Sequence, residues 1–117
     1  MLCLDHLSYH EFEGVALNLD ERERLIRDLG SSSMMLLRNH GTLTLGRNVA
    51  EAFTYMYFLM KACEIQVRAQ ACGPVHMPPE SAIETTRQQS QDLGRAAKLT
   101  WPALLRLLDS KYPGYAV

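Results

Sequence analysis

The four histidines of this 117-residue chain are the side chains best suited to bind a metal ion or to carry a proton. His40 has the most distinctive surroundings, because it lies in the short polar stretch Arg38–Gly41 between two apolar stretches. That position predicts a turn at the end of a strand, where functional side chains are often found. Two interpretations stay open from the residues alone: His40 is a metal ligand, or it is a structural residue that makes hydrogen bonds.

His6, His10 and His76 give weaker signals. His6 and His10 are four residues apart, so on a helix they would share one face and could bind one metal ion. The intermittent apolar positions of residues 1–19 predict extended or short-strand structure instead, and surface histidines are the favoured interpretation. His76 lies in a proline-rich loop and could join a site at His40 only if that loop folded back, so we expect it to be exposed. No two of the four histidines are separated by a single residue.

The charge and cysteine content exclude several classes of function. Twelve basic and 13 acidic residues give a formal net charge of -1, so no strong field attracts nucleic acid or an anionic membrane. Cys3, Cys63 and Cys72 have no C-x-x-C spacing and are odd in number, which argues against a disulfide framework. The first residues lack the basic and apolar regions of a secretion signal. We therefore expect a cytoplasmic protein with one modest core.

Two strands and one helix are predicted around the turn. Met34–Leu37 is a short apolar run typical of a buried strand, and Thr42–Leu45 alternates polar and apolar residues as a half-buried strand does. A surface helix is predicted upstream, with Asn18 or Asp20 as its cap and Gly30 as its stop. A hairpin that carries a histidine therefore follows a helix.

A long helix is predicted directly after the hairpin. Asn48 can cap it, and Glu51 completes a pattern similar to a capping box. Residues 49–60 are apolar nearly all round, which indicates a core or interface helix that needs cover on every side, and the run is too short to cross a bilayer. Gly73 and Pro74 end the helix. The remaining predicted elements are a polar helix over about 79–92 and an apolar helix over about 99–110, the second with Pro102 in its first turn.

Several motifs in the same order resemble the class II aldolase/adducin family, most closely its adducin-head branch. The strongest are Arg38–Gly41, Val49–Phe53 and Ala62–Arg68. Tyr9–Gly14 is similar to the Y-H-D-Y-E-G segment of the family, and Trp101–Asp109 is similar to the tryptophan-led helix near the end of adducin-like heads. The resemblance covers almost the whole chain.

The resemblance implies that residues 1–117 form the C-terminal half of a three-layer α/β/α domain with a small, mostly antiparallel sheet. It implies that His40 is the third of three histidines that hold a catalytic divalent metal, usually zinc. The other two ligands, a His-x-His pair, and an acid/base Glu belong to an earlier region of the family domain and are absent from this chain. The chain is therefore expected to be a partial domain.

Two functions from different classes follow from the resemblance. The first is a metal-dependent aldol lyase for sugar-phosphate-like substrates, inactive as this isolated piece. The second is a non-catalytic oligomerisation or protein-interaction module similar to the adducin head. In either case an open sheet edge predicts a homo-oligomer, and neither nucleic-acid binding nor membrane insertion is expected.

Overall fold

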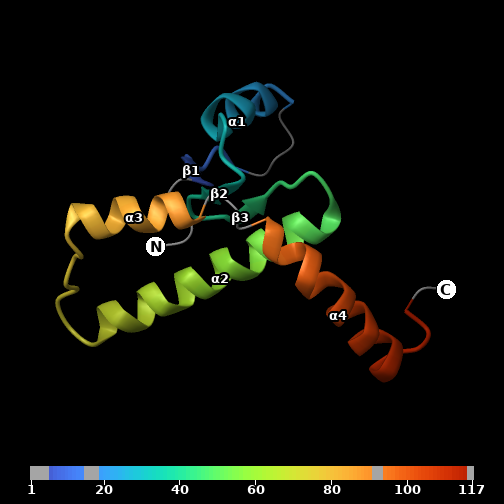
Figure 1. Ribbon diagram of the computed structural model, residues 1–117. Coiled ribbons are helices and arrows are strands. Elements are labelled where there is room, and N and C mark those ends of the chain that lie inside the picture. Colours follow the sequence, from blue (N-terminus) through green and yellow to red (C-terminus); the bar gives the residue numbers. More distant parts are fainter. Residues whose placement is uncertain (1–5, 15–18, 91–93, 116–117) are drawn as a thin grey trace.

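The computed structural model describes residues 6–14, 19–90 and 94–115. Within these residues the chain is an α/β structure of three short strands and four helices (Figure 1). In chain order the elements are β1 (Leu7–His10), α1 (Glu21–Leu29), β2 (Met34–Leu37), β3 (Gly41–Thr44), α2 (Val49–Ala71), α3 (Glu80–Ser90) and α4 (Arg95–Lys111). None of the described helices combines the length and the hydropathy that a membrane crossing requires.

The sheet is mixed and has the strand order β1-β2-β3. β1 runs parallel to β2, with Leu7 opposite Met34 and His10 opposite Leu37, whereas β2 runs antiparallel to β3. The predicted α/β class is confirmed, but the expectation of a mostly antiparallel sheet missed the parallel pairing of β1. That pairing follows from α1, because a helix between two strands carries the chain back to the end at which the first strand began.

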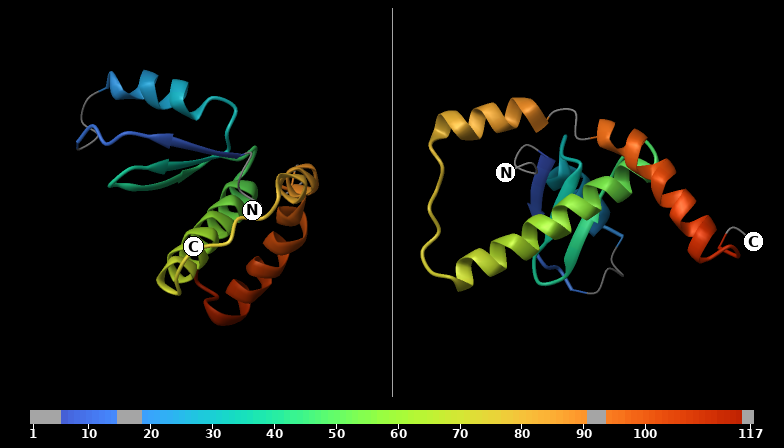
Figure 2. Two further views of the ribbon diagram at one scale, coloured as in Figure 1. Left: turned by 90° about the vertical axis from the view of Figure 1, so that its left-hand side faces the viewer. Right: turned by 60° about the horizontal axis from the view of Figure 1, so that its bottom comes forward.

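The sheet lies between two helical layers (Figure 2). α1 contacts β1 on one side, and α2 contacts β2 and β3 on the other side. α4 packs against α2, outside the sheet. α3 has no extensive contact with another described element. This agrees with the prediction of a polar helix, because such a helix has little apolar surface to pack.

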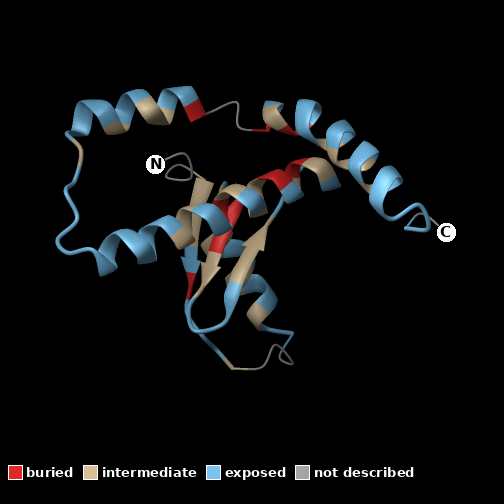
Figure 3. Cartoon of the chain, turned by 90° about the horizontal axis from the view of Figure 1, so that it is seen from below, coloured by how far each residue is buried: buried red, intermediate tan, exposed pale blue. Residues whose placement is uncertain are grey.

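The core is small and lies where α2 crosses the sheet (Figure 3). Met34 of β2 and Leu59 of α2 form its fully buried centre. The radius of gyration is 16.8 Å, whereas a compact domain of this length would have about 13 Å. Large apolar side chains of α2 accordingly remain exposed, among them Phe53, Tyr57 and Met60. The described chain does not itself cover every side of α2.

Most helix ends follow the predicted signals. The Asn48 side chain accepts a hydrogen bond from the Glu51 backbone N–H at 3.0 Å, which confirms the predicted cap of α2. Gly30 ends α1 with a φ of 55°, a conformation that favours glycine. Asp20 occupies the N-cap position of α1 but its side chain makes no capping hydrogen bond, and the alternative cap, Asn18, lies outside the described residues.

α4 starts at Arg95, earlier than predicted, so Pro102 lies inside the helix and not in its first turn. The prediction relied on the preference of proline for the first helical position. Here Gly94 occupies the N-cap position and Ala97 is buried, which favours an earlier start. Pro102 cannot donate to the carbonyl of Lys98, but Lys98 is exposed, so water can hydrate that carbonyl.

Candidate functional site

His40 lies on a tight turn at one end of the sheet, as predicted. The turn residues Arg38, Asn39 and His40 connect β2 to β3. The His40 backbone N–H donates to the Leu37 carbonyl at 3.0 Å. Asn39 has a φ of 55°, in the left-handed region that asparagine tolerates better than most residues. The turn therefore fixes the position from which the His40 side chain projects.

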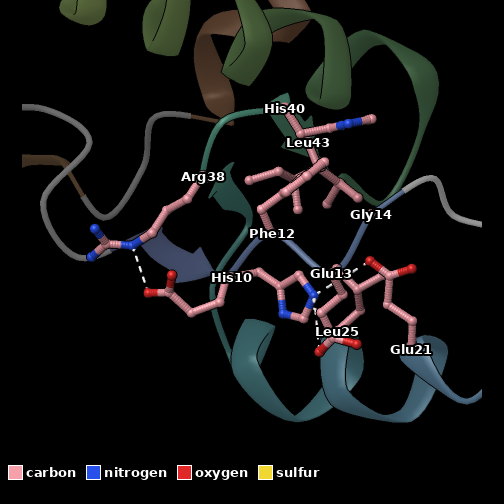
Figure 4. Close-up of a pocket in the computed structure, with 11 residues that line it drawn as sticks. His10, Phe12, Glu13, Gly14, Glu21, Leu25, Arg38, His40 and Leu43 are labelled. Carbon is pink, nitrogen blue, oxygen red and sulfur yellow. Dashed lines mark ion pairs between the residues drawn. The ribbon is translucent and has the colours of Figure 1, made fainter.

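The exposed His40 ring borders a small cavity of about 70 Å³ (Figure 4). Phe12, from the segment after β1, lies along one side of the ring, with 6.4 Å between ring centroids and 26° between the planes. The Arg38 guanidinium points away from the imidazole, where it forms an ion pair with Glu11 at 2.9 Å and lies 5.3 Å from the centroid of the Tyr9 ring. His40, the predicted metal ligand, is thus flanked by Phe12, which forms an aromatic wall, and by Arg38, which is ion-paired with Glu11.

His10 is buried, so its prediction as a surface histidine was wrong. Only 3% of the residue is exposed. Its Nδ1 lies 2.8 Å from a carboxylate oxygen of Asp28 in α1. Its Nε2 has no hydrogen-bond partner and faces Glu21 at 3.5 Å and Glu13 at 3.9 Å. The hydrogen bond with His10, followed by one from Arg27, lowers the pKa of Asp28.

The other predicted histidines do not join His40. His6 precedes β1 and its ring stacks on Tyr55, with 6.3 Å between ring centroids. Because β1 is a strand, His6 and His10 are not placed together by a helix. His76 is exposed in the loop between α2 and α3 and does not line the cavity beside His40. In the described ranges no three His, Cys, Asp or Glu side chains are arranged to hold a metal ion.

Half of the predicted capping-box pair is observed, because the Glu51 backbone N–H donates to Asn48, whereas the Glu51 carboxylate binds Arg47, a partner that the sequence did not reveal. Glu51 is almost fully buried at the junction of β3 and α2. Its carboxylate accepts hydrogen bonds from the Arg47 backbone N–H at 2.9 Å and from the Arg47 guanidinium at 2.7 Å. The guanidinium, followed by the backbone N–H, lowers the pKa of Glu51. A Cβ atom at Gly94 would lie 2.9 Å from the Tyr55 hydroxyl, so α4 begins close against this junction.

A larger apolar groove of about 580 Å³ lies between α2 and α4. Its wall includes Phe53 and Tyr57 of α2 and Leu104 and Leu107 of α4. The Phe53 ring also makes an edge-to-face contact with Trp101 of α4, with 5.6 Å between ring centroids. The groove thus leaves part of α2 uncovered, although this helix was predicted to need cover on every side.

Comparison with known proteins gives a consistent set of similarities. The family model described as Class II Aldolase and Adducin N-terminal domain matches residues 2–67. A Caulobacter vibrioides protein named for aldolase class 2 is 45% identical over 119 residues, which cover 99% of this chain and 46% of that protein. Rat (Rattus norvegicus) alpha-adducin is 33% identical over 124 residues, which cover 93% of this chain and 17% of that protein.

Solved structures share the fold. An aldolase II superfamily protein from Pseudomonas syringae has a TM-score of 0.89 and 39% identity, and the match covers 97% of this chain and 47% of that structure. L-fuculose 1-phosphate aldolase from Glaciozyma antarctica has a TM-score of 0.74 at 21% identity, a likeness of fold, over 95% of this chain and 43% of that structure. The chain thus spans about half the length of the bacterial relative and of both structures.

Proposed function

This chain belongs to the class II aldolase and adducin family, and on that premise we propose that it forms the C-terminal half of a divalent-metal-dependent aldol lyase domain. The observation that carries this proposal is the position of His40, exposed on a tight turn at the end of the sheet and beside a cavity. We assign His40 the role of one metal ligand, with zinc as the first candidate metal. The fold shared with an L-fuculose 1-phosphate aldolase supports sugar phosphates as the substrate class.

The described residues do not fit a metal ion by themselves, because they bring no three suitable side chains together. A single imidazole does not hold zinc tightly, since catalytic zinc sites use three protein ligands. We therefore propose that the missing ligands and the acid/base group come from a second half of the domain, either in a longer chain or in a partner. The 46% coverage of the Caulobacter vibrioides relative supports this division. Alone, the 117-residue chain is expected to be inert.

The contribution of this chain to the proposed site is to hold one imidazole in place. Together with the missing ligands, His40 would hold a divalent metal, which would supply Lewis-acid polarisation of a substrate carbonyl. Asn39 supplies the left-handed residue of the turn, and the hydrogen bond from the His40 backbone to Leu37 closes it. Phe12 restricts the ring from one side. The backbone of the hairpin thus places His40, and the neighbouring Phe12 ring limits the orientation of its imidazole.

We also propose that the protein assembles with further copies and resides in the cytoplasm. β1 and β3 are the outer strands of the described sheet, and an unpaired strand edge favours association with another chain. The apolar groove between α2 and α4 supports the same proposal. Cys63 and Cys72 are free thiols in the described chain, which suits a reducing compartment.

Zinc content tests the proposed role of His40. The purified chain is measured alone and after mixing with the part of the Caulobacter vibrioides relative that it does not match, each after dialysis against trace zinc. We expect little zinc in the chain alone, and stoichiometric zinc together with cleavage of L-fuculose 1-phosphate in the mixture. His40→Ala should abolish both, whereas His76→Ala, which changes an exposed loop histidine, should abolish neither. Stoichiometric zinc in the His40→Ala mixture would exclude His40 as a ligand.

The same experiment separates the second candidate function, a non-catalytic interaction module. The open groove between α2 and α4, with its exposed Phe53 and Tyr57, favours this candidate, as does the match to alpha-adducin. A mixture that forms a complex of the two pieces but binds no zinc would support the interaction module and contradict the lyase.

A further inference from the structure

Charged groups contribute to the attachment of α1 to the sheet. No residue of this helix is fully buried, and its most extensive contacts are with β1. Arg24 of α1 binds the Glu13 carboxylate through its Nε atom at 2.7 Å and through a second guanidinium nitrogen. Glu21 and Asp28 of the same helix both face the imidazole of His10. Leu25 and Leu29 of this helix are only partly buried, so the polar contacts add to a modest hydrophobic contribution in fixing where the helix lies.

His10 is the centre of this arrangement. Asp28 and Glu21 approach it from α1, and Glu13 approaches it from the segment that follows β1. The hydrogen bond at 2.8 Å requires a proton on Nδ1, because Asp28 is an acceptor. The Asp28 side chain therefore determines how the buried ring is oriented, in the way that a carboxylate orients a histidine in many functional sites.

The backbone of His10 is joined to the turn that carries His40. The His10 carbonyl accepts a hydrogen bond from the Arg38 backbone N–H at 2.9 Å. Two residues after His10, Phe12 lies against the His40 ring. Both residues line the same cavity as His40 (Figure 4). A displacement of His10 would therefore move the turn and the aromatic wall together.

We propose that His10 is a positioning residue for His40, held by Asp28 and Glu21, and that it couples the placement of α1 to the orientation of the His40 ring. The functional meaning of this coupling rests on the proposed role of His40 as a metal ligand. The coupling itself concerns the side chains of this chain and can be tested without metal.

The test records the ring signals of the histidines by NMR in the 117-residue chain. Asp28→Asn removes the charge that holds His10 and keeps the size of the side chain. Phe12→Leu removes the aromatic ring beside His40. It serves as the reference that gives the direction and size of the change in the His40 signals when this ring is lost. Glu23→Gln is the matched control, because it removes an exposed carboxylate from the same helix. Far-UV circular dichroism verifies that each variant is folded.

We expect Asp28→Asn to move the His40 ring signals in the same direction as Phe12→Leu and by a comparable amount, with Glu23→Gln leaving them unchanged. His40 signals that stay at their wild-type positions in Asp28→Asn, while those of His10 move, would overturn the proposal. If Asp28→Asn does not fold, Glu21→Gln is judged by the same criterion, since it removes the charge of the other α1 carboxylate that faces His10. Absence of zinc from the completed domain would refute the proposed function but leave this result unaffected.

Discussion

Replacing Leu59 with alanine tests the packing that holds α2 on the sheet. Leu59 is 1% exposed and forms the buried centre of the core together with Met34 of β2. The substitution removes the equivalent of about three methylene groups from this contact, a transfer free energy of about 2.4 kcal/mol. A residual cavity would raise the loss further, toward the range of about 2 to 5 kcal/mol measured for such substitutions.

The structure favours the lower part of that range. The side chains around the pair, which include Leu7, Tyr55 and Phe58, are only partly buried. They can move into the space that Leu59 leaves, so we expect a loss of about 2 to 3 kcal/mol in the free energy of unfolding. For a chain of this length the melting temperature should fall by roughly 6 to 15 °C.

Urea unfolding and thermal unfolding, both followed by far-UV circular dichroism, measure this loss. Ile65→Ala is the matched control, because Ile65 lies on the same helix and is 65% exposed. We expect it to change the free energy of unfolding by no more than about 0.5 kcal/mol. Equal losses in the two variants would refute the reasoning, since Leu59 would then contribute no more than an exposed residue.

Two further predictions concern the turn and the carboxylates. Asn39→Ala should lower the free energy of unfolding by about 1 kcal/mol and Asn39→Gly should leave it nearly unchanged, because only glycine accepts the left-handed backbone without cost; equal losses in urea unfolding would contradict this. The pKa values of Glu13 and Asp28 are lowered in the folded chain, chiefly by hydrogen bonds from Arg24 and His10. The free energy of unfolding should therefore keep the whole contribution of these two carboxylates at pH values above their ordinary pKa values of 4.5 and 3.8, and should lose it as they are protonated at lower pH. Unfolding experiments at several pH values measure this loss, and a free energy of unfolding that does not change over that range would contradict the assignment.

Local signals made the hairpin and the long helix predictable. The apolar run Met34–Leu37, the polar turn and the alternation after it specify a hairpin within a dozen residues, and the structure places His40 on that turn. Asn48 lies next to the helix that it caps, so its role can be read from neighbouring residues. Elements defined by contacts between residues close in sequence need no knowledge of the rest of the fold.

The features that sequence reasoning missed depend on contacts between distant residues. His10 is buried because Asp28 and Glu21 reach it from another element, and a single polar strand residue gives no sign of this. The early start of α4 depends on the fit of Gly94 against Tyr55. The role of His40 as a metal ligand remains a prediction, because the described residues bring no three suitable side chains together.

The parallel pairing of β1 also has a consequence for the order of folding. Leu37 and Gly41 pair across a short turn, whereas Leu7 pairs with Met34 across a long stretch of chain that includes α1. Closing the longer loop costs more chain entropy, and contacts between distant residues form more slowly. We expect the hairpin and α2 to form first and β1 with α1 to join last. The turn that carries His40 would then form before Phe12 packs beside the imidazole.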